Sequence, residues 1–255
     1  MRYAPPDLAK LDILLVEDDA FQRRLTVQAL RTLGCERVTA VEDGVQALDH
    51  LARERCALVL SDVHMPRMNG LELLRVVRAG RAGVKRDLRV ILLTSFSNTE
   101  VLGAAMALDV NGFLVKPLRK DLIADRVAMA LGERMHLRIG AAYAVVQTEL
   151  ATLPAADETA AQDDEPLPRH ALPPLFSRPA AKAGVAERQI AADQLEPGMR
   201  LTRDVRSRDG HVLIARGQTL TDGNVNRLND LRSLIDDAGI WVADTPPVVP
   251  GGTSA

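Results

Sequence analysis

The strongest constraint on the fold is an alternation in the first half of the chain, where short apolar runs are followed by segments of helical periodicity. Each run has the length of a buried strand, and each longer segment repeats its apolar residues every three or four positions. This alternation predicts an α/β domain, in which a parallel sheet of five strands is covered by helices on both faces. The expected strands cover residues 13–16, 37–41, 57–60, 89–93 and 112–115, and the expected helices cover residues 21–33, 44–53, 70–79, 99–108 and 118–131.

Polar side chains follow these apolar runs at the points where the predicted strands end. Glu17 and Asp18 follow the first strand, Asp62 the third, Thr94 the fourth and Lys116 the fifth. The carboxyl ends of parallel strands open on one edge of the sheet, where ligands bind. Three carboxylates gathered there would repel one another unless a divalent cation neutralised them, and oxygen ligands favour Mg²⁺. A carboxylate beside Mg²⁺ can attack a phosphorus centre, while a lysine and a hydroxyl share the charge of the transferred group.

These residues lie in four motifs that resemble those of a known family. Val16–Asp19 reads V-E-D-D, Asp62–Gly70 reads D-V-H-M-P-R-M-N-G, a Thr-Ser pair begins at Thr94, and Phe113–Pro117 reads F-L-V-K-P. In this order and at this spacing, the motifs resemble the receiver domain of two-component response regulators over residues 10–132. The resemblance implies a flavodoxin-like, doubly wound five-stranded parallel sheet and a role in a bacterial phosphorelay.

The resemblance implies that Asp62 accepts a phosphoryl group from a sensor histidine kinase or a phosphotransfer protein. It also implies that Asp18 and Asp62 bind Mg²⁺ directly. Glu17 would act mostly through water, and the backbone carbonyl of His64 would be a further ligand. The domain would assist its own phosphoryl transfer and hydrolysis without being an enzyme for another substrate. The alternative role for Asp62 is a cap of the following loop, and Asp19 is expected to cap a helix instead of binding metal.

The same resemblance implies that Thr94 and Lys116 contact the phosphoryl oxygens and that Phe113 occupies the position of an aromatic switch. Phosphorylation would draw Thr94 toward the phosphoryl group and let Phe113 turn into the vacated space, which would remodel the surface of residues 99–118. The helix in this surface is unusually apolar, so it is expected either to be thickly packed or to bind a partner, including a second copy of the chain. The alternatives are an ordinary surface lysine at Lys116 and a simple core residue at Phe113.

A proline-rich segment divides the chain into two unequal parts. Between residues 152 and 188 the apolar periodicity disappears and six of the 14 prolines occur, which predicts a disordered linker. The stretch before the linker carries an apolar stripe through Met135, Ile139 and Val146 and is expected to be a helical extension. The extension would either pair with a second subunit or fold back on its own domain. The expected organisation is a receiver domain at 1–132, the extension at 133–151, the linker at 152–188, an output module at 189–246 and a disordered tail at 247–255.

Residues 189–246 predict a second, smaller α+β domain. Asp209 and Gly210 form a hairpin signal, and Thr221 caps an amphipathic helix. The strings L-E-P-G-M-R-L-T-R-D-V and D-G-H-V-L-I-A-R-G-Q-T-L-T resemble the small β-rich domain that accompanies HD-GYP cyclic-di-GMP phosphodiesterases. No His-Asp dipeptide and no Gly-Tyr-Pro sequence occurs in the chain, so phosphodiesterase activity is not expected. The expected strands of this domain cover residues 200–205, 211–215 and 240–242.

Two kinds of output remain open for this module. Contact with a downstream protein through residues 189–246 is the expected output. The alternative is a receiver-controlled binder of a nucleotide second messenger such as cyclic-di-GMP. Four arginines suggest it, although the second element of a PilZ-like motif is absent: Arg200, Arg203, Arg206 and Arg208. DNA binding is not expected, because the predicted helix carries more aspartates than arginines and the whole chain has a net charge of -2.

Composition argues against several other classes of protein, namely membrane, secreted and nucleic-acid-binding proteins. The longest apolar stretches fall far short of the roughly 18 residues of a membrane span, and no signal pattern opens the chain, so a cytoplasmic protein without membrane insertion is expected. Cys35 and Cys56 lack metal-ligand spacing and predict reduced, half-buried thiols. The basic residues between Arg75 and Arg89 are interpreted as a solvated face, because no aromatic side chains lie among them for nucleic-acid stacking.

Overall fold

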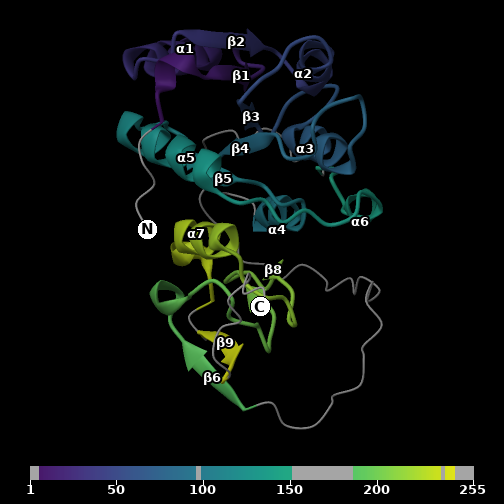
Figure 1. The fold of residues 1–255 in the computed structure, drawn as a ribbon, viewed down its shortest axis with the longest axis vertical. Coiled ribbons are helices and arrows are strands. Elements are labelled where there is room, and N and C mark those ends of the chain that lie inside the picture. The colour runs from purple at the N-terminus through teal and green to yellow at the C-terminus, as the bar shows by residue number, and fades with distance from the viewer. Residues whose placement is uncertain (1–5, 96–98, 151–185, 237–238, 245–255) are drawn as a thin grey trace, which may run out of the picture.

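The computed structural model describes residues 6–95, 99–150, 186–236 and 239–244 (Figure 1). The first part of the chain, the N-terminal domain, forms a five-stranded sheet with the order β2-β1-β3-β4-β5, in which all neighbouring strands are parallel. This order confirms the doubly wound, flavodoxin-like fold. The strands are β1 (Asp12–Val16), β2 (Arg37–Val41), β3 (Leu58–Asp62), β4 (Arg89–Thr94) and β5 (Gly112–Val115).

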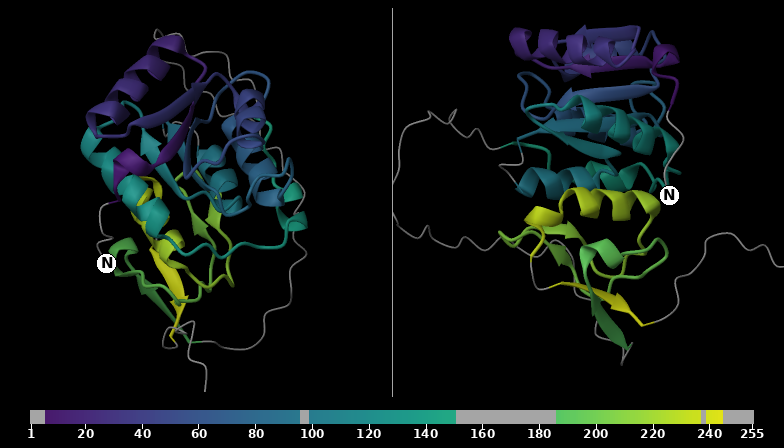
Figure 2. Two further views of the ribbon diagram at one scale, coloured as in Figure 1. Left: turned by 45° about the horizontal axis from the view of Figure 1, so that its top comes forward. Right: turned by 90° about the vertical axis from the view of Figure 1, so that its left-hand side faces the viewer.

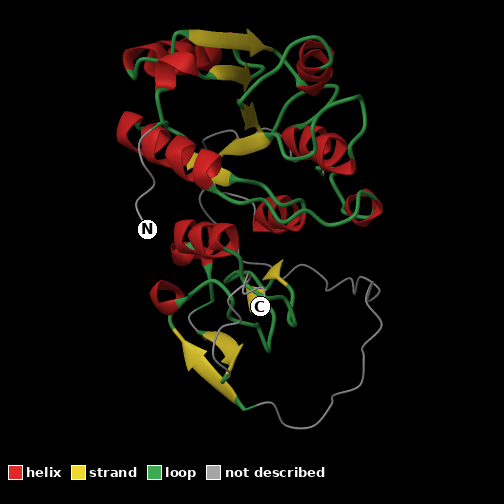
Figure 3. Ribbon diagram, in the orientation of Figure 1, coloured by secondary structure: helices red, strands yellow, loops and turns green. Residues whose placement is uncertain are grey.

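Helices cover both faces of this sheet, as Figure 3 shows. Side chains alternate between the faces along each strand, so that Ile13 and Leu15 join one apolar core while Leu14 and Val16 join the other. The first core is shared with α1 and α5, and the second with α2, α3 and α4. The helices are α1 (Ala20–Thr32), α2 (Gly44–Leu51), α3 (Gly70–Ala79), α4 (Thr99–Ala107) and α5 (Lys120–Gly132), and a short 3-10 turn, η1 (Leu8–Lys10), precedes the sheet.

Side-chain caps fix where three of these helices begin. Asp19 accepts a hydrogen bond from the backbone N–H of Gln22 at 2.7 Å, which confirms its expected role as the cap of α1. Asp43 caps α2, and Asn69 forms a reciprocal capping box with Glu72 at the start of α3. All three caps lie in loops that leave the carboxyl ends of strands, so they also order the edge of the sheet where the predicted site lies.

The segment after α5 folds back on the N-terminal domain. Its single helix within the described residues is the short α6 (Ala141–Ala144), so the expectation of a helical extension is wrong for most of residues 133–150. Gly140 lies so close to α3 that a Cβ there would be 2.9 Å from the Ala79 carbonyl oxygen. The buried Tyr143 hydroxyl donates to Asp109 at 2.6 Å. Because of these contacts the segment lies against α3 and Asp109, and it does not form the continuous helix that the apolar stripe predicts.

The C-terminal module contains short strands and one helix, which confirms a second, smaller domain. Two antiparallel pairs form, β6 with β9 and β7 with β8. The strand expected at 200–205 is wrong except at its last residue: Arg200 and Leu201 make only isolated bridges, to Thr219 and Val242. The elements are β6 (Glu187–Ile190), η2 (Ala192–Gln194), β7 (Val205–Arg206), β8 (Val212–Ile214), α7 (Asp222–Asp230), η3 (Arg232–Leu234) and β9 (Ile240–Ala243).

The module packs directly on the N-terminal domain. Figure 1 and both views of Figure 2 show α7 beside β5 and α4, and β8 contacts α4. The apolar core under α2, α3 and α4 continues into the module, from Phe113 and Leu102 to Val225 and Leu228. The apolar surface of α4 is thus partly covered by the chain's own module, and pairing of two copies through residues 99–118 or through the extension stays a prediction. The predicted linker and tail lie largely outside the described residues.

Two expectations from composition concern membranes and cysteines. Among the helices that the structure describes, none has the length and apolar character needed to cross a membrane. Both cysteines are free thiols and Cys56 is half-buried, as predicted, but Cys35 is fully buried instead of half-buried. Burial raises the pKa of Cys56 to about 11, with a smaller contribution from nearby carboxylates.

Candidate functional site

Three carboxylates meet at the carboxyl edge of the sheet, where the sequence predicts them. Glu17 and Asp18 follow β1, and Asp62 is the last residue of the neighbouring β3. One carboxylate oxygen from each residue lies within 4.8 Å of those of the other two. Glu17 and Asp62 are buried, whereas Asp18 is exposed. The cluster therefore presents buried negative charge on one side and an open side to solvent, through which a ligand can enter.

Lys116 bridges two of these carboxylates from the end of β5. Its Nζ lies 2.8 Å from Glu17 Oε2 and 2.6 Å from Asp62 Oδ2. Burial lowers the pKa of Lys116, but hydrogen bonds to Asp62 and Glu17 outweigh that effect, so its net pKa is raised and the ammonium is held charged. Lys116 is therefore part of the site, which argues against an ordinary surface lysine.

The charge of the cluster is not fully balanced by this lysine. Burial raises the pKa of Glu17 to about 6, against the lowering effect of its hydrogen bond from Lys116, and the Asp62 charge raises it further. The second oxygen of Glu17, Oε1, is buried without a hydrogen-bond partner in the described part of the chain. An unpartnered buried carboxylate oxygen beside two other carboxylates fits a cation site with oxygen ligands, which is the kind that Mg²⁺ prefers.

The backbone after β3 holds Asp62 in one orientation. The N–H groups of Val63 and His64 donate to Asp62 Oδ1 at 2.6 and 3.3 Å. Gly70 returns the loop to the strand end, where a Cβ would lie only 2.2 Å from the Asp62 carbonyl oxygen, so this position needs glycine. With Oδ1 bound by backbone and Oδ2 by Lys116, the carboxylate is fixed at the mouth of the site. The side chain of His64 is exposed.

Thr94 and Phe113 lie in the neighbouring strands β4 and β5, but Phe113 pairs with Leu92, two residues before Thr94, whereas Thr94 itself pairs with Val115 at the carboxyl end. Asp62 pairs with Leu93 in the register of β3 and β4, so Thr94 lies one position beyond it at the end of β4. Thr94 is buried. Phe113 in β5 is also buried and belongs to the core that α4 shares with the C-terminal module. The structure thus places the predicted switch residue between the sheet and the surface that it is expected to change.

Two contributors to the site are absent from the sequence prediction. The Arg23 guanidinium donates to the backbone carbonyls of Glu17 and Asp18, at 2.7 and 2.9 Å, and so fixes the turn that carries both acids. The Asn69 side chain donates to the Thr148 carbonyl at 2.8 Å, which ties the loop after Asp62 to the folded-back segment. In the sequence, nothing distinguishes Arg23, the fourth residue of α1, from an arginine whose side chain points into solvent.

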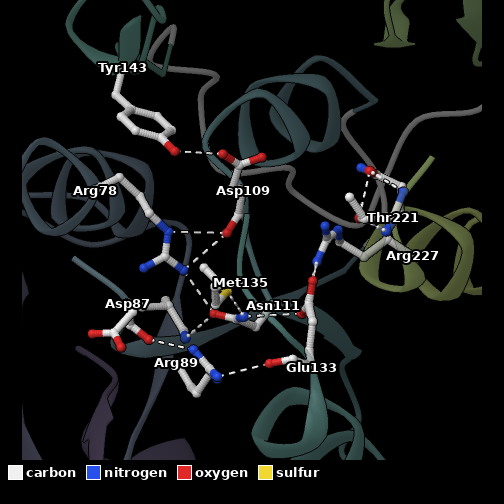
Figure 4. Close-up of polar contacts among 12 residues, drawn as sticks. Arg78, Asp87, Arg89, Asp109, Asn111, Glu133, Met135, Tyr143, Thr221 and Arg227 are labelled. Carbon is white, nitrogen blue, oxygen red and sulfur yellow. Dashed lines mark hydrogen bonds and ion pairs between the residues drawn. The ribbon is translucent and has the colours of Figure 1, made fainter. Parts of the chain in front are cut away.

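The interpretation of the basic run as a solvated face is wrong for Arg78. This side chain is fully buried and donates to the carbonyls of Arg86 and Leu88. It also donates to the Asp109 carbonyl and to the side chain of Asn111, as Figure 4 shows. Burial lowers its pKa to about 10, with an opposing effect from Asp109, so Arg78 stays charged at neutral pH. Its role is to satisfy backbone carbonyls at the opposite end of the sheet from the acidic cluster.

Comparisons with known proteins match the N-terminal domain. Residues 13–128 match the family described as response regulator receiver domain. A chemotaxis protein CheY homolog of Campylobacter jejuni is 32% identical over 123 residues, which cover 48% of this chain and 93% of that protein. Chemotaxis protein CheY1 of Helicobacter pylori is 30% identical over 123 residues, which cover 48% of this chain and 98% of that protein.

A solved structure with similarity over the same region is the receiver domain of a sensor histidine kinase from Pseudomonas aeruginosa, which has a magnesium ion coordinated in its active-site cleft. It is 30% identical, covers 48% of this chain and 98% of its own, and has a TM-score of 0.43. The family match spans all five strands, and the acidic cluster and Lys116 lie at their carboxyl ends. The chain therefore belongs to the response regulator receiver family, with a CheY-like receiver domain of a two-component system in its N-terminal half.

Proposed function

We propose that this protein is a response regulator that is phosphorylated on Asp62 by a sensor histidine kinase or a phosphotransfer protein. The observation that carries the proposal is the fixed Asp62 carboxylate, which is bound by Lys116 at 2.6 Å and lies in a cluster with Glu17 and Asp18. In the transfer, an Asp62 oxygen forms a bond to phosphorus while the bond from phosphorus to the donor histidine nitrogen breaks.

The proposed metal ligands are Asp18 and Asp62, with Glu17 acting mostly through water and the backbone carbonyl of His64 as a further ligand. Bound Mg²⁺ would supply positive charge against the oxygens of the transferred group. Lys116 would share this task from the other side, because its ammonium already lies within hydrogen-bond distance of Asp62. The unpartnered Oε1 of Glu17 supports this assignment, since a metal-bound water would satisfy it.

The proposed switch joins the site to the face formed by α4 and β5. Thr94 would move toward the phosphoryl oxygens, and Phe113 would turn into the space that it leaves. Phe113 is buried in the core that continues into the C-terminal module, so a change of its rotamer would alter packing there. The proposed coupling is a change in the relative populations of two conformations of the molecule, which differ in the positions of Thr94 and Phe113.

For the C-terminal module we propose contact with a downstream protein. Its resemblance to the domain that accompanies HD-GYP phosphodiesterases is part of the proposal, and the absence of His-Asp and Gly-Tyr-Pro sequences argues against that catalysis. Binding of cyclic-di-GMP is less well supported. Arg203 stacks on Trp241, with 3.7 Å from its guanidinium carbon to the ring centroid, and pairs with Glu187, so a nucleotide would have to displace both contacts.

The phosphoacceptor can be tested by labelling the full chain with a small-molecule phosphodonor such as acetyl phosphate in the presence of Mg²⁺. Wild-type protein should gain one phosphoryl group, and Asp62→Asn should gain none. Asp19→Asn is the matched control, because Asp19 is a nearby acid that caps α1 and asparagine caps equally well. Labelling that persists in Asp62→Asn, or that does not require Mg²⁺, would contradict the proposed site.

A further inference from the structure

A cavity of about 550 Å³ lies at the edge of the sheet opposite the acidic cluster. Two loops form its walls, one between α2 and β3 and the other between α3 and β4, and Leu131 of α5 also lines it. These loops precede their strands, whereas Asp62 and Lys116 lie where strands end. The cavity has the volume of a small-molecule site, and the proposed phosphorylation makes no use of it.

Two arginines of the basic run order the loop between α3 and β4. Arg78 donates to the carbonyls of Arg86 and Leu88, at 2.7 and 2.8 Å. Arg89 donates to the Glu133 carbonyl at 2.9 Å, as Figure 4 shows. This wall of the cavity is therefore held in place before any ligand enters, which lowers the entropic cost of binding.

Three other cations line the cavity without partners. The side chains of Arg53, Arg55 and Lys85 are exposed, and within the described residues they form no hydrogen bond or ion pair. Arg53 and Arg55 lie in one wall and Lys85 in the other, so positive charge without a partner lies on both sides of the cavity. With Arg89, four basic residues stand against two acidic ones, which leaves a net charge of +2. A phosphate group would satisfy these cations, because its oxygens match the donors of arginine and lysine.

Apolar side chains form the second part of the lining. They come from both walls and from the adjoining helices: Leu51, Cys56, Val84, Leu88 and Leu131. Inorganic phosphate or a sugar phosphate would leave this surface uncovered, whereas the flat ring of a nucleobase can pack on it. The carboxylates of Glu54 and Asp87 form no ion pair in the part of the chain that the structure describes, so they can accept hydrogen bonds from hydroxyl or amino groups of a ligand.

We propose that this cavity binds a nucleoside monophosphate. The phosphate would lie between Arg55 and Lys85, the base would pack on the apolar side chains, and the ribose hydroxyls would face the two carboxylates. The proposal does not rest on the proposed function, because the cavity contains no residue of the acidic cluster. A bound nucleotide would contact both loops at once, so it would stabilise the folded receiver domain against unfolding.

Binding can be tested by calorimetric titration of the full chain with AMP, GMP, CMP and UMP. Mg²⁺ is left out, so that the acidic cluster cannot hold the phosphate through a metal ion. At least one of the four nucleotides should bind with a Kd below about 1 mM. Its nucleoside and inorganic phosphate should each bind roughly tenfold more weakly or less, because each meets only one part of the lining. Absence of binding by all four nucleotides, or equal binding of a nucleotide and either of its parts, would overturn the proposal.

Substitutions in the two walls test the role of the cations. Arg55→Gln and Lys85→Gln should each weaken binding roughly tenfold, because each removes a charge-assisted hydrogen bond to the phosphate. Both side chains are exposed, so these variants should fold as the wild type does, which circular dichroism checks. Arg81→Gln is the matched control, because Arg81 is exposed in the same loop as Lys85 and does not line the cavity. An equal loss of binding in Arg81→Gln would show that general positive charge, and not the cavity, attracts the nucleotide.

Cys56 reports where the nucleotide binds. It lines the cavity, and Cys35, the other cysteine of the chain, is buried. Alkylation of Cys56 at mildly alkaline pH, followed by mass spectrometry, should slow when the nucleotide is present, because the ligand covers the thiol. In Lys85→Gln the same nucleotide concentration should give less protection. Unchanged alkylation of Cys56 in wild-type protein saturated with nucleotide would overturn the proposed location, even where calorimetry detects binding.

Discussion

Lys116 holds the acidic cluster together, because its ammonium group lies within hydrogen-bond distance of both Glu17 and Asp62. An apolar strand followed by Lys-Pro is enough to predict a lysine at the ligand edge of the sheet. The two contacts, to Glu17 and Asp62, depend on the order of the strands, because β1, β3 and β5 are distant in the chain. The role of Arg23 could not be predicted from the sequence, because its guanidinium binds two backbone carbonyls and no side chain of the motifs.

Replacement of Lys116 by methionine should make the stability of the protein depend on Mg²⁺. Without the ammonium, Glu17 and Asp62 lose two charge-assisted hydrogen bonds, so the free energy of unfolding at neutral pH should fall by about 1.5–3 kcal/mol. Added Mg²⁺ should restore more stability to this variant than to the wild type. Chemical denaturation with and without Mg²⁺ measures both effects.

Lys120→Met is the control for this experiment, because Lys120 is an exposed lysine at the start of α5. It should behave as the wild type does at every Mg²⁺ concentration. Equal stabilisation of all three proteins by Mg²⁺ would mean that the ion does not bind beside Lys116.

At the scale of elements, prediction succeeded where apolar periodicity alone decides the structure. All five strands of the receiver domain run parallel, and β1, β3, β4 and β5 are almost entirely buried, so their apolar runs are easily seen. The edge strand β2 is largely exposed, and its shorter apolar pattern is the weakest of the five. The segment after α5 was predicted as a helix from a stripe of apolar residues, yet only α6 forms there. Its conformation is decided by contacts with α3 and with Asp109, which local sequence does not encode. The same applies to residues 200–205, which are ordered by isolated bridges to distant residues.

Tyr143→Phe should loosen this folded-back segment. The Tyr143 hydroxyl donates to Asp109 and accepts from the backbone N–H of Arg138, at 2.6 and 2.9 Å, and the side chain is fully buried. Loss of the hydroxyl removes both hydrogen bonds, although Asp109 keeps its ion pair with Arg138 at 3.5 Å, so the free energy of unfolding should fall by about 1–3 kcal/mol. Thermal or chemical denaturation measures the change, and Val145→Ala, at an exposed neighbour, should have almost no effect. A segment that stands free of the domain would tolerate both substitutions equally.

At the scale of the whole molecule, the contact between α5 and α7 makes the stability depend on pH, because Asp230 of α7 pairs there with Arg126 of α5. Burial raises the pKa of Asp230 to about 6, and the lowering effects of Arg126 and Arg227 only partly oppose it. Since the ordinary value is 3.8, the native protein binds more protons than the unfolded chain between pH 4 and 6. The contribution of Asp230 to stability is therefore present at pH 4 and lost as the pH rises through 6.

The free energy of unfolding of the wild type minus that of Asp230→Asn should therefore fall by roughly 2–3 kcal/mol between about pH 4 and about pH 7, and then stay level. Taking the difference cancels the other carboxylates, including Glu17, which titrates in the same range. Urea denaturation at a series of pH values gives the curve. A difference that is flat across this range would place Asp230 in water, away from α5.

The sequence could predict two domains but not that they share a core. The proline-rich stretch between them indicates two separate domains. Nothing in the local sequence indicates that Gly103 lies against Val212 of the module, or that Glu133 pairs with Arg227. The roles of these residues can be recognised only when the surfaces of the receiver domain and the module are considered together. The arrangement of domains is therefore the part of this molecule that depended most on the structure.

The continuous apolar core predicts how the two domains behave after the chain is cleaved between them. Cleavage between residues 151 and 185 leaves intact the apolar core and the Glu133–Arg227 pair that join the described parts of the two domains. The two fragments should therefore stay associated and migrate as one species under native conditions. A receiver fragment made alone would instead expose the apolar face of α4 and β5 and leave Glu133 facing water without Arg227. Its behaviour would describe a surface that the intact protein keeps hidden.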